Sequence, residues 1–218
     1  MKITFEEIKK DRSIKAYIEK ADQSLRALGY TEHSFVHVTK VADLASKILL
    51  ALGHSERDAE LARISGYLHD IGNVINRVDH AQSGALMAFR ILDNMGADPE
   101  DIATIVTAIG NHDESTAFPV NSIAAALILA DKTDVRRTRV RKQPVEQFDI
   151  HDRVNYSVTE SDVTIEDQVI TLRITIETEI CSVMEYFEIF LGRMLLCKKA
   201  AAQLGTDFHL IVNEQRMM

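Results

Sequence analysis

The sequence predicts a mainly α-helical protein, a helical bundle, with a small C-terminal α+β segment. Through roughly the first 142 residues, apolar side chains recur at spacings of three and four, as on the buried face of a helix. Beyond residue 150 the pattern changes to alternating β-branched stretches, which are typical of strands. The 218 residues suffice for one sizeable core and an appendage. We therefore expect a helical domain at residues 1–145 and a C-terminal subdomain at residues 146–218.

Apolar faces and end signals mark the helices of the first domain. The faces are Ile14-Ile18-Leu25-Leu28, Val38-Val41-Leu44-Ile48, Leu61-Ile64-Leu68 and the apolar run Ile123 to Ala130. Glycines that suit helix C-termini are Gly29, Gly53 and Gly96. Residues that suit helix N-termini are Ser55, Pro99 and either Asn121 or Ser122. These signals predict short connections between successive helices.

The C-terminal subdomain is predicted to run strand, strand, helix, strand. The first two strands carry Val154-Tyr156-Val158 and Ile170-Leu172-Ile174-Ile176, with Glu166-Asp167-Gln168 between them, as in an antiparallel hairpin. A helix spans about Cys181 to Leu204, stops at Gly205 and is followed by a strand at residues 208–212. This subdomain either covers an apolar face of the first domain or supplies a homodimer interface through an edge strand.

Composition limits the kinds of partner. A formal net charge of −8 argues against sequence-independent nucleic-acid binding, which needs a basic face, but allows a small phosphorylated substrate. No apolar stretch approaches the roughly 20 residues that span a bilayer, and the N-terminus lacks a signal-peptide core. Cys181 and Cys197 would lie about 24 Å apart along one predicted helix, which is too far for a disulfide. We therefore expect a cytoplasmic protein without membrane association.

Imidazoles and carboxylates at helix positions form a candidate metal site. His69-Asp70 ends an apolar helical run near Gly72, and a helix end lets adjacent side chains converge. Asp131 interrupts an apolar helix, where a buried carboxylate needs a partner such as a cation. The candidate ligands are His33, His37, His69, Asp70, His80, His112 and Asp131.

Each ligand also has a structural interpretation. His33 and His37, four residues apart in one predicted helix, share a face and would serve equally as core histidines. His80 would suit a helix N-terminus, and Asp131 would suit a helix emerging into solvent. Taken together, imidazole and carboxylate donors without thiolates favour a catalytic transition-metal site over structural zinc. Five or six such donors exceed one tetrahedral site, which indicates two ions with Asp70 as a bridge.

Charged residues near these ligands suit phosphate chemistry. Six cations follow Asp131: Lys132, Arg136, Arg137, Arg139, Arg141 and Lys142. Lys132 and Arg136 are the better candidates to bind phosphate, although a solvated face or a domain interface would look the same. Asp113 and Glu114, beside His112, are candidates to orient water or to protonate a leaving group. Another His-Asp pair, His151-Asp152, lacks a preceding apolar helix and is interpreted as a hinge or cap.

The order His37, His69-Asp70 and Asp131 resembles the HD-domain metal-dependent phosphohydrolase superfamily. The phrases His37-Val38-Thr39-Lys40-Val41-Ala42, Tyr67-Leu68-His69-Asp70-Ile71-Gly72 and Leu129-Ala130-Asp131-Lys132 carry the resemblance, over roughly residues 30–140. It implies a helical core whose first metal is bound by His37, His69, Asp70 and Asp131. His80 and His112 resemble the two extra histidines of the binuclear subgroup, in which Asp70 bridges the ions. Many relatives have Lys where this chain has Asn73.

The leading hypothesis is hydrolysis of a phosphoester or phosphoanhydride in a nucleotide-like small molecule. One or two divalent ions, iron or manganese before nickel, cobalt, zinc or magnesium, would lower the pKa of bound water. Lys132 or Arg136 would stabilise the charge that develops on phosphate. Two alternatives stay open: a di-iron oxygenase of the same fold, and a metal-stabilised sensor or dimeric binding module without turnover.

Overall fold

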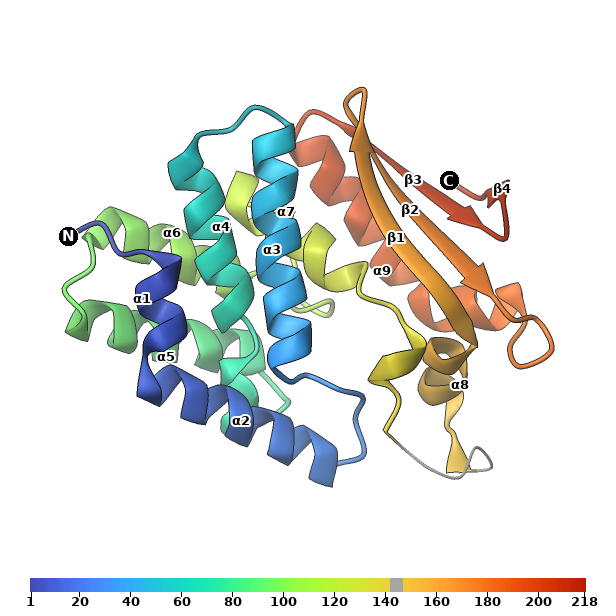
Figure 1. The fold of residues 1–218 in the computed structure, drawn as a ribbon, viewed down its shortest axis with the longest axis horizontal. Helices are drawn as coiled ribbons and strands as arrows, with labels where there is room; N and C mark the ends of the chain where they lie inside the picture. The colour runs from blue at the N-terminus through green and yellow to red at the C-terminus, as the bar shows by residue number, and fades with distance from the viewer. Residues whose placement is uncertain (142–146) are drawn as a thin grey trace.

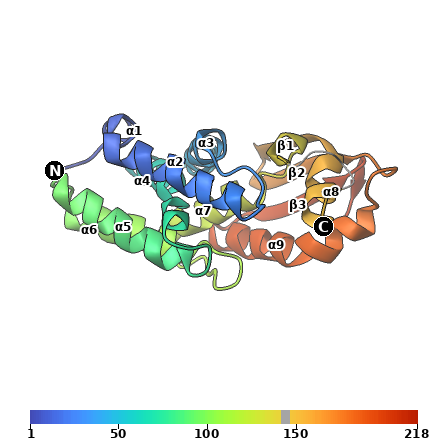
Figure 2. The ribbon, with the colours of Figure 1, turned by 90° about the horizontal axis from the view of Figure 1, so that it is seen from below.

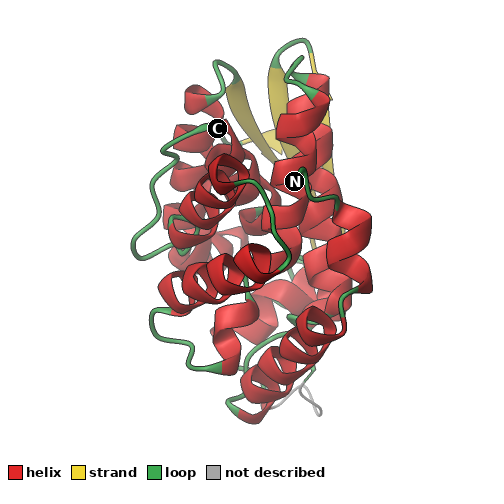
Figure 3. Ribbon diagram, turned by 90° about the vertical axis from the view of Figure 1, so that its left-hand side faces the viewer, coloured by secondary structure: helices red, strands yellow, loops and turns green. Residues whose placement is uncertain are grey.

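The computed structural model describes residues 1–141 and 147–218 and confirms a mainly α-helical fold with a small C-terminal sheet (Figures 1 and 3). The first part contains α1 (Phe5–Lys10), α2 (Arg12–Ala27), α3 (Phe35–Ala51), α4 (Glu56–Leu68), the 3₁₀ turn η1 (Ile71–Val74), α5 (His80–Asn94), α6 (Pro99–Gly110) and α7 (Ser122–Lys132). The second contains η2 (Arg137–Arg139), α8 (Ile150–Ser157), β1 (Val158–Glu166), β2 (Val169–Ile176), α9 (Val183–Gln203), β3 (Asp207–Val212) and β4 (Gln215–Arg216). The expected domain boundary at residues 145 and 146 lies outside the described residues, as does Lys142.

The predicted helix ends are confirmed by local geometry. Ser55 accepts a hydrogen bond from the Asp58 amide, and Asn121 accepts one from the Ala124 amide. Pro99 occupies the first turn of α6, where its missing amide hydrogen costs nothing. Gly29, Gly53, Gly96 and Gly205 all have φ between 70° and 84°, the left-handed conformation that ends a helix.

One predicted helix and one predicted strand have the wrong bounds. His33 does not belong to the helix of His37, because α3 begins at Phe35 after the N-cap Ser34. Val154 and Tyr156 lie in α8 rather than in a strand, and β1 begins only at Val158. The local reason is a capping box in which Asp149 and Asp152 exchange side-chain hydrogen bonds with each other's backbone amides. This cap starts a helix, and the helix buries Val154 despite the alternating pattern.

The C-terminal sheet has the strand order β1-β2-β3-β4. The hairpin of β1 and β2 is antiparallel as predicted, and Asp167 and Gln168 at its turn have positive φ. The β2–β3 pair is parallel, with α9 as the connection between them. Helix α9 packs against both β3 and α7 (Figure 2). A single cluster of buried apolar side chains therefore continues from the helices into the sheet.

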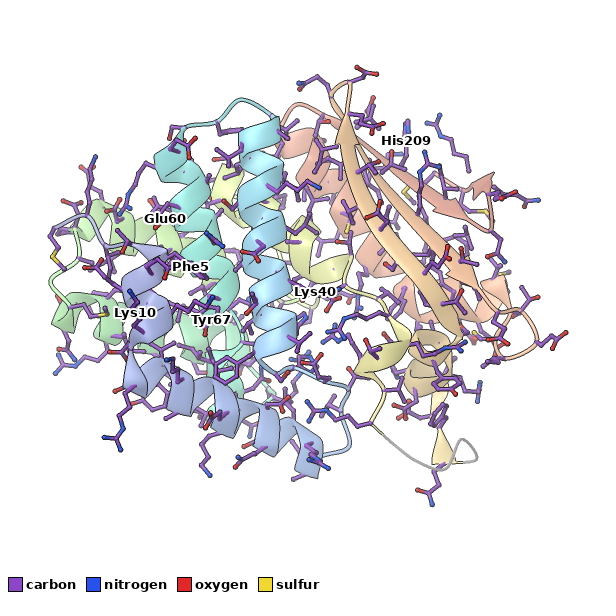
Figure 4. All side chains as sticks on the ribbon, viewed as in Figure 1. Phe5, Lys10, Lys40, Glu60, Tyr67 and His209 are labelled. Atoms are coloured by element: carbon purple, nitrogen blue, oxygen red, sulfur yellow. The ribbon has the colours of Figure 1, made fainter. Side chains whose placement is uncertain are left out.

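Helix α4 is held in place by contacts with α1 and with α3. Phe5 of α1 meets Tyr67 of α4 edge to face, with ring centroids 5.4 Å apart, and Glu60 accepts a hydrogen bond from the Phe5 amide (Figure 4). On the α3 side, a Cβ at Gly66 would lie 2.7 Å from the Ala42 Cα, so only glycine permits this approach. The result is a rigidly held end of α4, from which His69 and Asp70 project.

In the part of the chain that the structure describes, no helix is both long enough and apolar enough to cross a bilayer.

Candidate metal centre

The chain turns sharply directly after α4. His69 is the C-cap of the helix, and Asp70 connects it to η1. Gly72 lies inside η1 rather than in a left-handed helix end as expected, and its role is close approach: a Cβ there would lie 2.0 Å from the His80 carbonyl oxygen. Because η1 presses against the first turn of α5, His80 is brought to the same place as His69 and Asp70.

Four imidazole Nε2 atoms converge on the two carboxylates at Asp70 and Asp131. His37 Nε2 lies 3.3 Å from Asp131 Oδ1 and 3.7 Å from Asp70 Oδ2, and His69 Nε2 lies 3.2 Å from Asp70 Oδ2. On the other side, the Nε2 atoms of His80 and His112 lie 3.5 Å and 4.0 Å from Asp70 Oδ1. Three overlapping triads of donors each fit within 4.8 Å: His37-His69-Asp70, His69-His112-Asp131 and Asp70-His80-His112.

The opposite ring nitrogens fix which nitrogen faces the centre. The Nδ1 atoms of His69, His80 and His112 each lie within 3.0 Å of the carbonyl oxygen three residues earlier. A carbonyl oxygen can only accept, so each Nδ1 carries the hydrogen and each Nε2 keeps its lone pair. His37 Nδ1 contacts Asp134 Oδ2 at 2.8 Å, the carboxylate–histidine pairing common in metal sites.

Three of the four Nε2 lone pairs at the centre have no hydrogen-bond partner among the described residues. Within the described chain, the only buried side-chain nitrogen or oxygen atoms without a hydrogen-bond partner are His37 Nε2, His69 Nε2 and His112 Nε2. Buried polar atoms are normally satisfied, because an unpaired one costs about 1–3 kcal/mol. All three point at the same pair of carboxylates. Divalent ions would satisfy them, so the residues fit a metal centre.

Burial and neighbouring charges hold most of these groups in the protonation states that bind metal. Burial lowers the pKa of His112 to about 3, and burial also lowers the pKa of His80. Burial raises the pKa of Asp70, but the surrounding imidazoles, His69 first among them, outweigh it, so the pKa of Asp70 lies well below its ordinary value. Asp70 in turn raises the pKa of His69 against the effect of burial. The carboxylate is therefore ionised at neutral pH.

The cluster forms the floor of a cavity of about 410 Å³, which His33, Asp70, His80, His112, Asp131 and Lys132 all line. The ring of His33 lies 5.4 Å from the ring of His37, and its Nδ1 contacts the Thr31 carbonyl. It reaches the cavity from the loop before α3, not from the helix. Lys132 Nζ lies 2.5 Å from Asp131 Oδ2 and is buried, so it brings one positive charge to the cavity floor.

The other sequence candidates divide into near and far groups. Asp113 Oδ1 lies 3.9 Å from His80 Nε2, whereas Glu114 is paired with Arg193 of α9. Arg136 is held by Glu32 and Asp134 at 2.6 Å and 2.9 Å and does not line the cavity. The remaining described cations of that run are also engaged, Arg137 with Glu177, Arg139 with the Glu32 and Asp134 carbonyls, and Arg141 with Asp22. Of these three, only Arg139 lines the cavity.

Arg77 is the functional candidate that sequence reasoning missed. Its Nη1 lies 3.4 Å from His80 Nε2, 3.3 Å from Asn73 Oδ1 and 3.9 Å from Asp70 Oδ1. Asn73 also donates to Asp70 Oδ1 at 2.8 Å and so orients the carboxylate. The spacing of Asn73, Arg77 and His80, three and four residues, was the available signal. His151 and Asp152 line the same cavity as well, and Asp152 also takes part in the helix cap that the sequence suggested for this pair.

The sequence of this chain matches a known protein family and is similar to several known proteins. Residues 34–154 match the HD domain family. The chain is 29% identical over 121 residues to Ribonuclease Y of Aster yellows witches'-broom phytoplasma. The aligned segment covers 56% of this chain and 21% of that protein. It is 27% identical over 173 residues to an uncharacterized protein of Methanocaldococcus jannaschii, covering 69% of this chain and 66% of that one. This chain thus spans about a fifth of Ribonuclease Y and just under two thirds of the archaeal protein.

Proposed function

This chain belongs to the HD domain family, a superfamily of metal-dependent phosphohydrolases, and we propose that it hydrolyses a phosphoester of a small molecule with one or two divalent metal ions. The observation that carries the proposal is the set of three buried, unpartnered Nε2 atoms aimed at Asp70 and Asp131. Such a set is costly without metal and is suited to imidazole-binding divalent ions.

Two groups of residues would hold two ions. His37, His69, Asp131 and Asp70 Oδ2 face one side, and His80, His112 and Asp70 Oδ1 face the other. The two oxygens of Asp70 thus serve both groups, as a bridging carboxylate does. Metal ions held there would supply Lewis acidity, polarising a phosphoryl oxygen and lowering the pKa of water. Iron or manganese suits this mixed donor set, and nickel, cobalt, zinc or magnesium are the alternatives to test.

The chain's own residues would bind and orient the phosphate. Lys132 on the floor and Arg77 at the rim place two cations beside the cluster, where they would stabilise negative charge on phosphoryl oxygens. Arg77 takes the part that sequence reasoning gave to Arg136, whose guanidinium two carboxylates already neutralise. The hydrogen bond from Ser115 helps lower the pKa of Asp113 against burial, so Asp113 is ionised and suits accepting a hydrogen bond from water.

Charge favours a small substrate over a nucleic-acid strand. Arg136, Arg137 and Arg141, which a strand would need as free cations, are paired with carboxylates. The likeness to Ribonuclease Y makes RNA the second candidate. A strand would have to bind a chain of net charge −8.

A reconstitution assay tests the proposal. Protein stripped with EDTA is reloaded with each metal separately and assayed for phosphate release from phosphomonoesters, nucleotides and RNA, with and without oxygen. We expect turnover of a small phosphoester in at least one metal, without a need for oxygen. Oxygen-dependent turnover would favour the di-iron oxygenase, RNA cleavage alone would favour the second candidate, and absence of turnover would favour a sensor.

The phosphate role of Arg77 is tested with a matched pair of variants. Arg77→Gln should lower kcat/KM by roughly 10- to 100-fold, because one charge-assisted hydrogen bond to phosphate is lost. Arg137→Gln is the control, since Arg137 pairs with Glu177 outside the cavity. Equal kinetics for the two variants would remove Arg77 from the site.

Homodimerisation stays a prediction. Strand β1 lies at one edge of the sheet, so it is the strand that could pair with a second copy of the chain. Sedimentation over a wide concentration range measures it directly, and a mass of one chain throughout would contradict it.

A further inference from the structure

Four basic side chains line the cavity beside the metal cluster, and carboxylates neutralise them to different extents. They are Arg77, Lys132, Arg139 and Arg193. Lys132 contacts Asp131 at 2.5 Å, and Arg193 contacts Glu114 at 3.2 Å. In the part of the chain that the structure describes, neither Arg77 nor Arg139 donates a hydrogen bond to a carboxylate. Their closest carboxylate oxygens, on Asp70 and Asp134, lie 3.9 Å and 3.7 Å away. Arg77 and Arg139 are therefore the least neutralised of the four cations.

Arg139 is buried although its hydrogen bonds go to neutral acceptors. The residue is only 5% exposed, yet it lines the cavity. Its Nε and Nη2 donate to the Glu32 carbonyl oxygen at 3.0 Å and 2.8 Å, and Nη1 donates to the Asp134 carbonyl oxygen at 3.0 Å. The Asp134 carboxylate itself already contacts His37 and Arg136. A guanidinium has five N–H donors, so two remain for another group. Because a buried charge normally has a partner of opposite charge, Arg139 is suited to an anionic ligand.

Both arginines contact the loop before α3, which borders the cavity. The Arg77 guanidinium lies 5.6 Å from the centre of the Tyr30 ring. Arg139 binds Glu32 through its side chain and also through its backbone, since the Glu32 amide donates to the Arg139 carbonyl oxygen at 2.8 Å. Arg77 lies 3.4 Å from His80 Nε2, whereas Arg139 forms no hydrogen bond or ion pair with a candidate metal ligand in the described chain. A phosphate at the metal cluster would therefore meet Arg77, and Arg139 lies further along the same loop.

We propose that Arg139 binds a second phosphate group of the substrate, and that the substrate is a small molecule with phosphates at two separate positions. One phosphate would lie at the metal cluster with Arg77, and the other would accept hydrogen bonds from the two remaining N–H groups of Arg139. A substrate with a single phosphate would leave the Arg139 charge without an anion. Asp149 and Asp152 also line the cavity, but both already have partners in the cap of α8. This inference rests on the proposed phosphohydrolase function and adds the substrate class.

Two pairs of compounds, each differing only by the second phosphate, test this subsite. D-Fructose 6-phosphate is compared with D-fructose 1,6-bisphosphate, and adenosine 5′-phosphate with adenosine 3′,5′-bisphosphate, in wild type, Arg139→Gln and Arg137→Gln. Arg137 is the control because it lies in η2 with Arg139, pairs with Glu177 and does not line the cavity. Wild type should prefer at least one bisphosphate to its monophosphate by roughly 10- to 100-fold in kcat/KM, as expected for charge-assisted hydrogen bonds. Arg139→Gln should lose most of that preference, and Arg137→Gln should keep it.

Controls separate failure of this subsite from failure of the proposed function. Melting temperatures establish folding, and if Arg139→Gln does not fold, Arg139→Lys replaces it and should still lose about 10-fold of the preference, because an ammonium lacks the forked donors. If no phosphoester is hydrolysed, phosphohydrolase function fails, and titration calorimetry of the metal-loaded protein with the same four compounds then measures the subsite directly. Equal values within both pairs in wild type would overturn the proposal. So would an equal loss for both members of a pair in Arg139→Gln, because Arg139 would then bind the same phosphate as Arg77.

Discussion

Two of the chain's three His-Asp pairs, His69-Asp70 and His151-Asp152, lie at one cavity and differ in their surroundings. His69-Asp70 follows the last turn of α4, where both residues are buried and face the cluster. His151-Asp152 lies in the first turn of α8, where the His151 side chain is 64% exposed and Asp152 accepts a hydrogen bond from the Asp149 amide. The two dipeptides are identical, but one follows the C-terminal end of a helix and the other lies at the N-terminal end of a helix.

The polarity of a helix end explains the difference. A C-terminal end offers unpaired carbonyl oxygens, which take the Nδ1 hydrogen of a following histidine and leave Nε2 free to bind metal. His69 uses Gly66 in this way, and His112, just after α6, uses Ile109. An N-terminal end offers unpaired amides instead, which take a carboxylate as a cap. The same dipeptide is therefore suited to metal ligation after a helix and to capping at its start.

The largest expected effect comes from exchanging the carboxylates of the two pairs for amides. Asp70→Asn should lose bound metal and lower kcat/KM by on the order of 10³-fold or more, because both groups of donors share its oxygens. Asp152→Asn should keep its metal content. Elemental analysis of both purified variants measures this, and loss of metal from both would erase the distinction between the pairs.

A smaller effect is expected from Asp134 and Asp149, the carboxylates that contact His37 of the cluster and Asp152 of the α8 pair. Asp134 lies 2.8 Å from His37 Nδ1, and Asp134→Asn should weaken metal binding roughly 10- to 100-fold while leaving the ligands in place. Asp149→Asn removes the corresponding partner of the α8 pair and should leave metal affinity unchanged. Competition titration with a metal chelator gives both affinities, and a match between them would show that Asp134 does not support the site.

Acid should destabilise the folded protein through His112 of the buried cluster. Burial lowers the pKa of His112 from 6.5 to about 3, so the unfolded chain takes up a proton near pH 6.5 that the folded chain refuses. Stability from this group is present above pH 6.5 and falls as the pH drops toward 3. Between pH 7.5 and pH 5, metal-free wild type should lose about 2 kcal/mol more unfolding free energy than His112→Gln. Urea unfolding in EDTA measures this, and parallel losses would contradict it.

The smallest expected effects lie in α8. Asp152→Ala should cost about 1 kcal/mol of unfolding free energy, the usual value of a lost helix cap. His151→Ala should change stability by no more than about 0.5 kcal/mol, because its side chain is mostly exposed. Thermal unfolding resolves the two, and a larger effect from His151 would assign that residue a structural contact that its exposure does not indicate.

Local signals in the sequence were sufficient for most helices and for the cluster itself. Caps such as Ser55 and Asn121 act within four residues, so their helices begin where the sequence places them. His69-Asp70 and Asp131 are marked by apolar runs that end at them. The alternation of Val154 and Tyr156 predicted a strand wrongly, because the Asp149–Asp152 capping box just before them favours a helix.

Contacts between distant residues could not be read from the sequence. The sequence predicted that Arg136 would bind phosphate, but Glu32, over a hundred residues away in the sequence, pairs with it. Arg77 reaches His80 only because Gly72 lets η1 press against α5. The positions of Asn155 and Arg193 on the cavity depend on how α8 and α9 pack beside α7, which no local pattern specifies.

Metal stoichiometry tests the central claim most directly. Wild type and His80→Ala, stripped with EDTA and reloaded with manganese, are compared by elemental analysis after gel filtration. Because Asp70 faces two groups of donors, we expect about two ions per chain in wild type and about one in His80→Ala. A wild-type chain that holds no manganese, or any other divalent metal tried in its place, would contradict the assignment of these histidines as ligands.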